Sequence, residues 1–128
     1  MAAFLITNYT ISKFYVRVNP TSRTLITSLQ LTGVPETGPQ NSATIYFGGP
    51  TTVGDTTPAD KYPGYFLSNR VVGLLGDDQF AIWYDILRSE RPVKLGYSPD
   101  KPVDFANLIN LTLYTGPEPV GEGPADKS

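Results

Sequence analysis

The sequence predicts a mainly β fold, an antiparallel β-sandwich or small barrel of six to seven strands with one amphipathic α-helix at about residues 77–90. Two observations support this prediction. Most apolar runs alternate with polar residues at a period of two, as half-buried strands do, and short segments rich in Gly, Pro and Asn separate them. Only one stretch has a helical period, and the strand–helix alternation of a doubly wound parallel sheet is absent.

The first two alternating runs, residues 10–18 and 25–32, predict an antiparallel hairpin. The turn between them is Asn19-Pro20-Thr21-Ser22, in which proline presets the backbone. Further strands are predicted at residues 43–47, 65–67, 71–75, 93–97 and 106–114, the last with Ile109, Leu111 and Leu113 facing inward. The connections are predicted at residues 33–42, 48–63 and 98–104; the second is the longest, and long loops are often functional.

The predicted helix has a wide apolar stripe made by Phe80, Trp83, Tyr84 and Leu87. Ile82 and Ile86 widen the stripe beyond what one buried face needs, so we expect cover on more than one side. Asp77 is the expected N-cap, and Pro92 is expected to stop the helix because the residue before a proline avoids the α region. Trp83 and Leu87 are the expected core anchors.

We expect residues 1–116 to form a single β-rich domain and residues 117–128 to form an acidic C-terminal tail rich in Pro and Gly. Composition alone predicts a tail without a core of its own. The basic residues Lys13, Arg17 and Arg23 lie in a part of the chain without acids, so we expect the acidic tail to dock on the first hairpin, of its own chain or of a neighbour.

Composition excludes several classes of function. With 12 acidic and 10 basic residues the net charge is −2, which argues against a general nucleic-acid binder. The chain has no cysteine and no histidine, which excludes disulfides, thiolate metal sites and Ser-His or Cys-His catalysis within one chain. We therefore expect no metal and no cofactor. No apolar run is long enough to span a membrane and no signal peptide is recognisable, so we expect a cytoplasmic protein with no membrane partner.

The best candidate recognition patch lies beside the longest loop, where Tyr62 and Tyr65 accompany Asp60 and Asn69. Tyrosine has a polar tip that suits interfaces, although strands also use it for packing. Asp55 and Asp60 lack the spacing of a calcium loop. Asp77 and Asp78 are adjacent on a helix and do not face each other, so helix capping explains them better than acid–base chemistry.

The segments Leu87-Arg88-Ser89-Glu90-Arg91-Pro92-Val93 and Glu118-Pro119-Val120-Gly121-Glu122-Gly123 resemble small uncharacterised bacterial proteins that carry the same step and the same tail. The resemblance covers about the last third of the chain. It implies a bacterial cytosolic origin and assigns no activity or site residues.

The sequence thus favours a non-catalytic binding or assembly module, with itself (as a homo-oligomer) or another protein as its partner. The alternative is a lectin-like carbohydrate binder that stacks sugars on Tyr62 and Tyr65. A hydrolase that uses two carboxylates is less favoured, because the sequence does not place two acids within ~5–10 Å of each other.

Overall fold

The fold was determined as a computed structural model, which describes residues 2–48, 52–53, 57–58 and 62–115. The strands are β1 (Ala2–Asn19), β2 (Ser22–Thr37), β3 (Ser42–Phe47), β4 (Thr52–Val53), β5 (Thr57–Pro58), β6 (Gly64–Phe66), β7 (Val71–Leu75), β8 (Val93–Pro99) and β9 (Ala106–Thr115). A 3-10 turn, η1 (Asp77–Gln79), leads into the helix α1 (Phe80–Ser89). The predicted tail lies outside the described residues.

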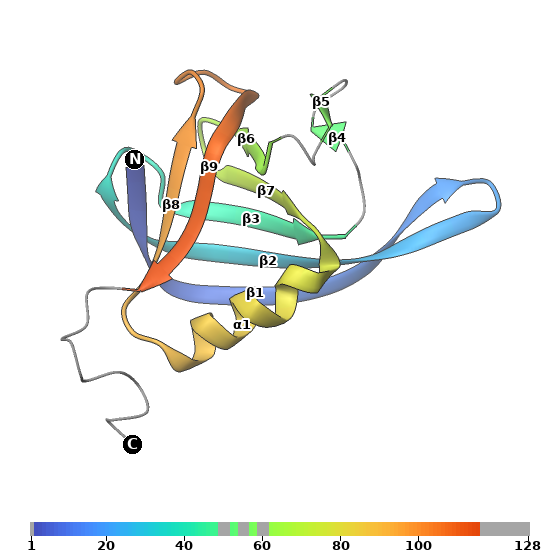
Figure 1. Ribbon diagram of the computed structural model, residues 1–128, viewed down its shortest axis with the longest axis horizontal. Coiled ribbons are helices and arrows are strands. Elements are labelled where there is room, and N and C mark those ends of the chain that lie inside the picture. Colours follow the sequence, from blue (N-terminus) through green and yellow to red (C-terminus); the bar gives the residue numbers. More distant parts are fainter. Residues whose placement is uncertain (1, 49–51, 54–56, 59–61, 116–128) are drawn as a thin grey trace.

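Seven strands close into a barrel in the order β1-β2-β3-β7-β6-β9-β8, and β4 and β5 pair separately (Figure 1). This confirms the predicted small β-barrel with one helix. One neighbour relation differs from the expectation of an antiparallel sheet, because β3 and β7 run parallel. The chain reaches β7 from β3 through the segment that holds β4, β5 and β6, and this long connection lets β7 return in the same direction as β3.

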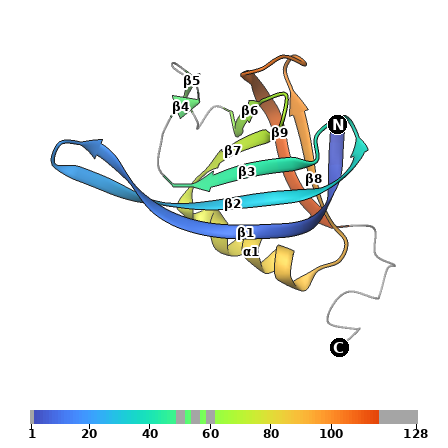
Figure 2. The same cartoon turned by 180° about the vertical axis from the view of Figure 1, so that it is seen from behind.

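The barrel interior is packed with inward-facing side chains from every strand of the barrel and from the helix. Phe4, Leu29, Ile45, Leu95 and Leu108 are fully buried inside it. The helix α1 connects the end of β7 to the start of β8 and lies beside β1 (Figure 2). Its buried residues are Trp83 and Leu87, as the sequence predicts, and the Trp83 ring packs edge-on against Phe47 at a centroid distance of 6.0 Å.

The ends of the helix differ from the expectation. Asp77 is not the N-cap: it is the first residue of the 3-10 turn, and no side chain caps either η1 or α1. Because Asp77 itself has helical backbone, it contributes only negative charge to the first turn, which the helix dipole favours. The helix ends at Ser89 and Glu90 is already extended, so the chain leaves the helix before Pro92.

The residues of the last strand, β9, that face the core also differ from the prediction. Ile109 was expected inside, but it is 63% exposed, whereas Leu108 is fully buried. The register shows the cause: Ser98 pairs with Asn110, but the next residue, Pro99, pairs with Leu108. A bulge therefore adds one residue to β9 and turns the side chains before it to the opposite face.

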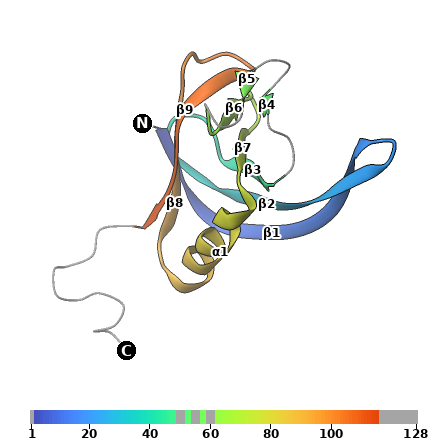
Figure 3. The same cartoon turned by 45° about the vertical axis from the view of Figure 1, so that its right-hand side comes forward.

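The first hairpin is longer than predicted. β2 continues through residues 33–37, which were expected in a loop, and residues 2–5 of β1 pair with β8. At the other end, β3 pairs with β2 only over residues 27–32. Beyond Thr27, β1 and β2 pair only with each other and form a two-stranded arm that projects from the barrel (Figure 3).

Candidate functional site

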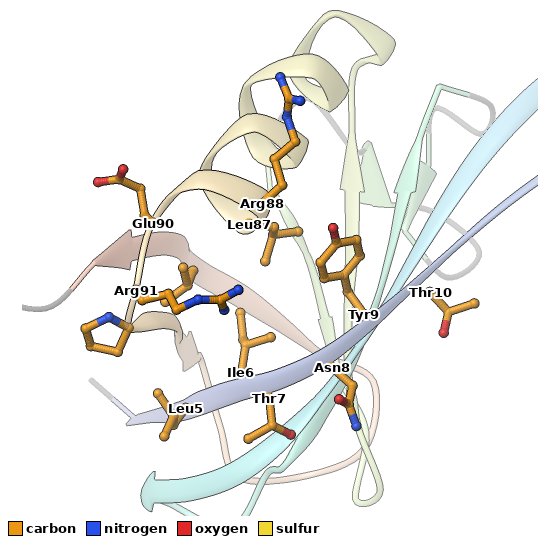
Figure 4. Close-up of a pocket in the computed structure, with 12 residues that line it drawn as sticks. Leu5, Ile6, Thr7, Asn8, Tyr9, Thr10, Leu87, Arg88, Glu90 and Arg91 are labelled. Carbon is orange, nitrogen blue, oxygen red and sulfur yellow. The ribbon is translucent and has the colours of Figure 1, made fainter. Parts of the chain in front are cut away.

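A groove with a cavity volume of about 880 Å³ lies between β1 and the C-terminal end of α1 (Figure 4). Six consecutive residues of β1 form one side, and the last turn of the helix with the segment leading to β8 forms the other. The lining residues are Leu5, Ile6, Thr7, Asn8, Tyr9, Thr10, Leu87, Arg88, Glu90, Arg91, Pro92 and Val93.

The groove exists because β1 loses a neighbouring strand. β8 pairs with β1 only from Ala2 to Leu5, since the chain before Val93 belongs to the helix connection and not to the sheet. From Ile6 onward, β1 keeps β2 on one side and has no strand on its other side among the described residues. The groove therefore runs along an open edge inside an otherwise closed barrel.

The direction of the backbone groups at this edge follows from two hydrogen bonds. The Gly33 N–H donates to the Asn41 oxygen at 2.8 Å and so points toward β3. The backbone N–H and C=O of the neighbouring Thr32 then point toward β1. In agreement, the Thr7 hydroxyl donates a hydrogen bond to the Thr32 carbonyl at 3.3 Å. Tyr9 pairs with Leu31, one residue further along, so strand alternation turns the Tyr9 N–H and C=O away from β2 and into the groove.

The groove lining is mixed, and its apolar part is formed by core and aromatic residues. Leu87 and Val93 are buried, and Ile6 packs against the core. The Tyr9 ring meets the ring of Tyr84 from α1 edge to face at 6.3 Å, which ties β1 to the helix at one end of the groove. This surface suits a segment that offers apolar side chains together with backbone hydrogen-bonding groups.

The rim of the groove carries two arginines with different surroundings. Arg88 donates to Asp85 at 3.1 Å and its guanidinium lies 5.3 Å from the centre of the Tyr84 ring. Arg91 extends between the helix end and β1, and makes no ion pair or hydrogen bond with any described residue. Glu90 points away from the groove (Figure 4). The free positive charge at the mouth is therefore that of Arg91, and it favours an anionic group.

The residues predicted for recognition lie elsewhere. Tyr65 is in β6 and Asn69 is exposed in the turn before β7, where its carbonyl accepts a hydrogen bond from Ser42. Tyr62 is half-buried, and Asp60 lies outside the described residues. The Tyr65 ring stacks on Phe105 at 5.8 Å. Phe105, which is 68% exposed and has a φ of 64°, was not singled out from the sequence.

The groove itself was missed, because no pattern in residues 5–10 shows that β8 stops pairing at Leu5. Within the described residues, no three His, Cys, Asp or Glu side chains come together in a way that could hold a metal ion. No helix in that part of the chain is long and apolar enough to span a membrane.

No family model, curated protein or solved structure matches this chain. The resemblance of its last third to small bacterial proteins therefore stays a prediction.

Proposed function

We propose that this protein is a non-catalytic binding module that holds an extended, acidic peptide segment of another protein chain in the groove between β1 and α1. The observation that carries the proposal is the open edge of β1, where the Tyr9 N–H and C=O face the groove. Extended peptides bind such edges by adding a strand: main-chain hydrogen bonds give affinity and pockets for alternate side chains give specificity.

The groove supplies both parts of this recognition. Alternate side chains of an added strand point to opposite faces. Those on one face would meet the apolar surface formed by Ile6, Leu87 and Val93, and those on the other would lie near the rim. The free guanidinium of Arg91 favours a carboxylate there, because charge-assisted hydrogen bonds to arginine are stronger than neutral ones.

Self-association is the special case in which the bound segment belongs to a second copy. An uncovered strand edge is a template for pairing with another chain. The sequence contains an acidic candidate for such a segment in residues 117–128, which carry Glu118, Glu122 and Asp126. Light scattering of the protein alone separates this case from binding to a different protein.

The test uses fluorescently labelled peptides of about eight residues that alternate Val with Glu, compared with peptides that alternate Val with Lys. We expect the Glu peptide to bind and the Lys peptide to bind at least tenfold more weakly. Tyr9→Pro removes the N–H that faces the groove and leaves the β1–β2 ladder intact, since proline is tolerated where the strand's N–H side is free. Tyr9→Val removes the same ring and keeps the N–H.

We expect Tyr9→Pro to abolish peptide binding and Tyr9→Val to retain most of it. Arg91→Gln should lower the affinity for the Glu peptide by about fivefold, which corresponds to the loss of ~1 kcal/mol for a charged hydrogen bond at a partly exposed site. If Tyr9→Pro and Tyr9→Val bind alike, main-chain pairing at β1 plays no part and the proposal fails.

A second candidate function rests on a separate observation, the stacked pair of Tyr65 and Phe105. The half-buried ring of Tyr65 and the exposed ring of Phe105 offer a planar surface of the type that stacks on sugar rings, in line with the carbohydrate alternative. A glycan array with the Phe105→Ser variant as control tests it. Binding that survives the substitution, or no glycan signal at all, would exclude the platform.

A further inference from the structure

The arm, in which β1 and β2 pair only with each other beyond the last β2–β3 pair at Thr27, is not needed to close the barrel, and its two faces differ. In the pairing of β1 with β2, Lys13 lies opposite Thr27, Tyr15 opposite Leu25 and Arg17 opposite Arg23. Because alternate residues of a strand point to the same side, these six side chains share one face. The contact of Arg23 with Tyr15 confirms this, because the guanidinium carbon lies 4.2 Å from the ring centre. On the opposite face, the Phe14 ring meets the ring of Tyr46 from β3 at a centroid distance of 6.3 Å.

The shared face is exposed, basic and aromatic. Tyr15 is 59% exposed and Leu25 is 46% exposed, and all three cations of the arm are exposed as well. The first acidic residue of the chain is Glu36, which lies beyond the arm and pairs with Lys94 at 2.9 Å. The net charge of −2 therefore hides a local cluster of three positive charges.

The register of the arm places two of these charges together, which favours a bound polyanion. Arg17 and Arg23 are directly opposite each other on the two strands, and like charges at such positions destabilise a β-ribbon. Arg17 also donates to the Pro20 oxygen at 3.2 Å, which fixes one of its amino groups near the tip. A chain of negative charges laid along this face would remove the repulsion.

We propose that this face of the arm binds single-stranded nucleic acid, with Lys13, Arg17 and Arg23 on the phosphates and Tyr15 stacking on a base. Proteins that bind single strands without sequence preference combine a positive track for the backbone with aromatic rings for the bases. The turn Asn19-Pro20-Thr21-Ser22 contains no large apolar residue, so the arm lacks the apolar tip that insertion into a membrane would need. The proposal replaces the expectation, drawn from net charge, that nucleic acid is not a partner.

The test measures fluorescence anisotropy of a labelled oligothymidylate of about 20 nucleotides with the full-length protein. With three phosphate contacts, the slope of log affinity against log salt should be about −2, so affinity should fall about 20-fold between 50 and 200 mM salt. Arg17→Gln with Arg23→Gln should reduce the slope to about −0.7. The matched control, Arg70→Gln with Lys101→Gln, removes the same charge away from the arm and should leave the slope unchanged.

Tyr15 gives an independent readout. Tyr15→Ser should weaken binding at least fivefold, whereas Tyr15→Phe keeps the ring and should bind as the parent does. The proposal would be overturned if the two double charge variants lost affinity equally, or if binding did not depend on salt. A preference for duplex DNA of the same length, or for anionic phospholipid vesicles over the oligonucleotide, would overturn it as well. The groove variant Tyr9→Pro should bind the oligonucleotide normally, so failure of the peptide site and failure of the arm are distinguishable.

Discussion

Replacing Trp83 with alanine tests whether the helix is part of the barrel core or only a connection laid on its surface. Trp83 is 8% exposed and its ring contacts Phe47, itself 1% exposed, so the substitution leaves a cavity at the junction of helix and barrel. Removing a buried tryptophan side chain costs about 3–5 kcal/mol. A domain of this size has a total stability of ~5–15 kcal/mol, so we expect a large loss in the free energy of unfolding.

The assays are urea unfolding and thermal melting, both followed by far-UV circular dichroism, because the variant lacks the only tryptophan and its fluorescence. At about 3–5 °C per kcal/mol for a chain of this length, the melting temperature should fall by roughly 10–20 °C. Ile82→Ala is the matched control: it lies on the same helix, is 55% exposed, and should cost less than ~1 kcal/mol. Similar losses for the two variants would show that α1 is not packed into the core as described.

Three other changes have defined outcomes. Gly33→Ala should destabilise the protein by about 1–3 kcal/mol, because the new Cβ would overlap the Leu5 carbonyl oxygen of the neighbouring strand β1; denaturant titration measures this. Burial raises the pKa of Tyr97, so the unfolded chain loses the phenol proton at a lower pH than the folded protein does. The free energy of unfolding should therefore fall as pH rises above about 10, and Tyr97→Phe should lessen this fall. From pH 6 to 8 the free energy of unfolding should not change, because the chain has no histidine. Deleting residues 117–128 should lower the melting temperature or change the oligomeric state seen by light scattering, because the acids of this segment complement the cations of the first hairpin; a full-length protein that is a 14.0 kDa monomer at high concentration would contradict self-association.

The elements with a strong local period were predictable from the sequence. The stripe through Trp83 and Leu87 identified the helix, and alternation identified the strands of the first hairpin. The end of the helix was placed one residue late, because Pro92 restricts only its immediate neighbour and the chain is already extended at Glu90.

The features that depend on neighbouring strands were not predictable. A parallel and an antiparallel partner select the same apolar alternation, so nothing in β3 distinguishes β7 from any other neighbour. The bulge opposite Pro99 inverts the faces of Leu108 and Ile109, and both are ordinary strand residues. The groove has the same origin, because it arises where β8 stops pairing with β1. The sequence did show the cations of the arm, but only the register places Arg17 opposite Arg23.

The groove and the basic face of the arm both include residues of β1, and their spacing along this strand has a consequence for binding. Tyr9 faces the groove and Tyr15 lies on the arm, six residues further along β1, which is about 20 Å in an extended strand. A short acidic peptide that occupies Leu5 to Thr10 should therefore leave the arm free, and both ligands should bind together. A longer acidic segment that continues along the same open edge would bring its carboxylates to Lys13 and Arg17, where the nucleic acid is proposed to bind. We therefore expect acidic partners to displace an oligonucleotide only when they extend beyond the groove.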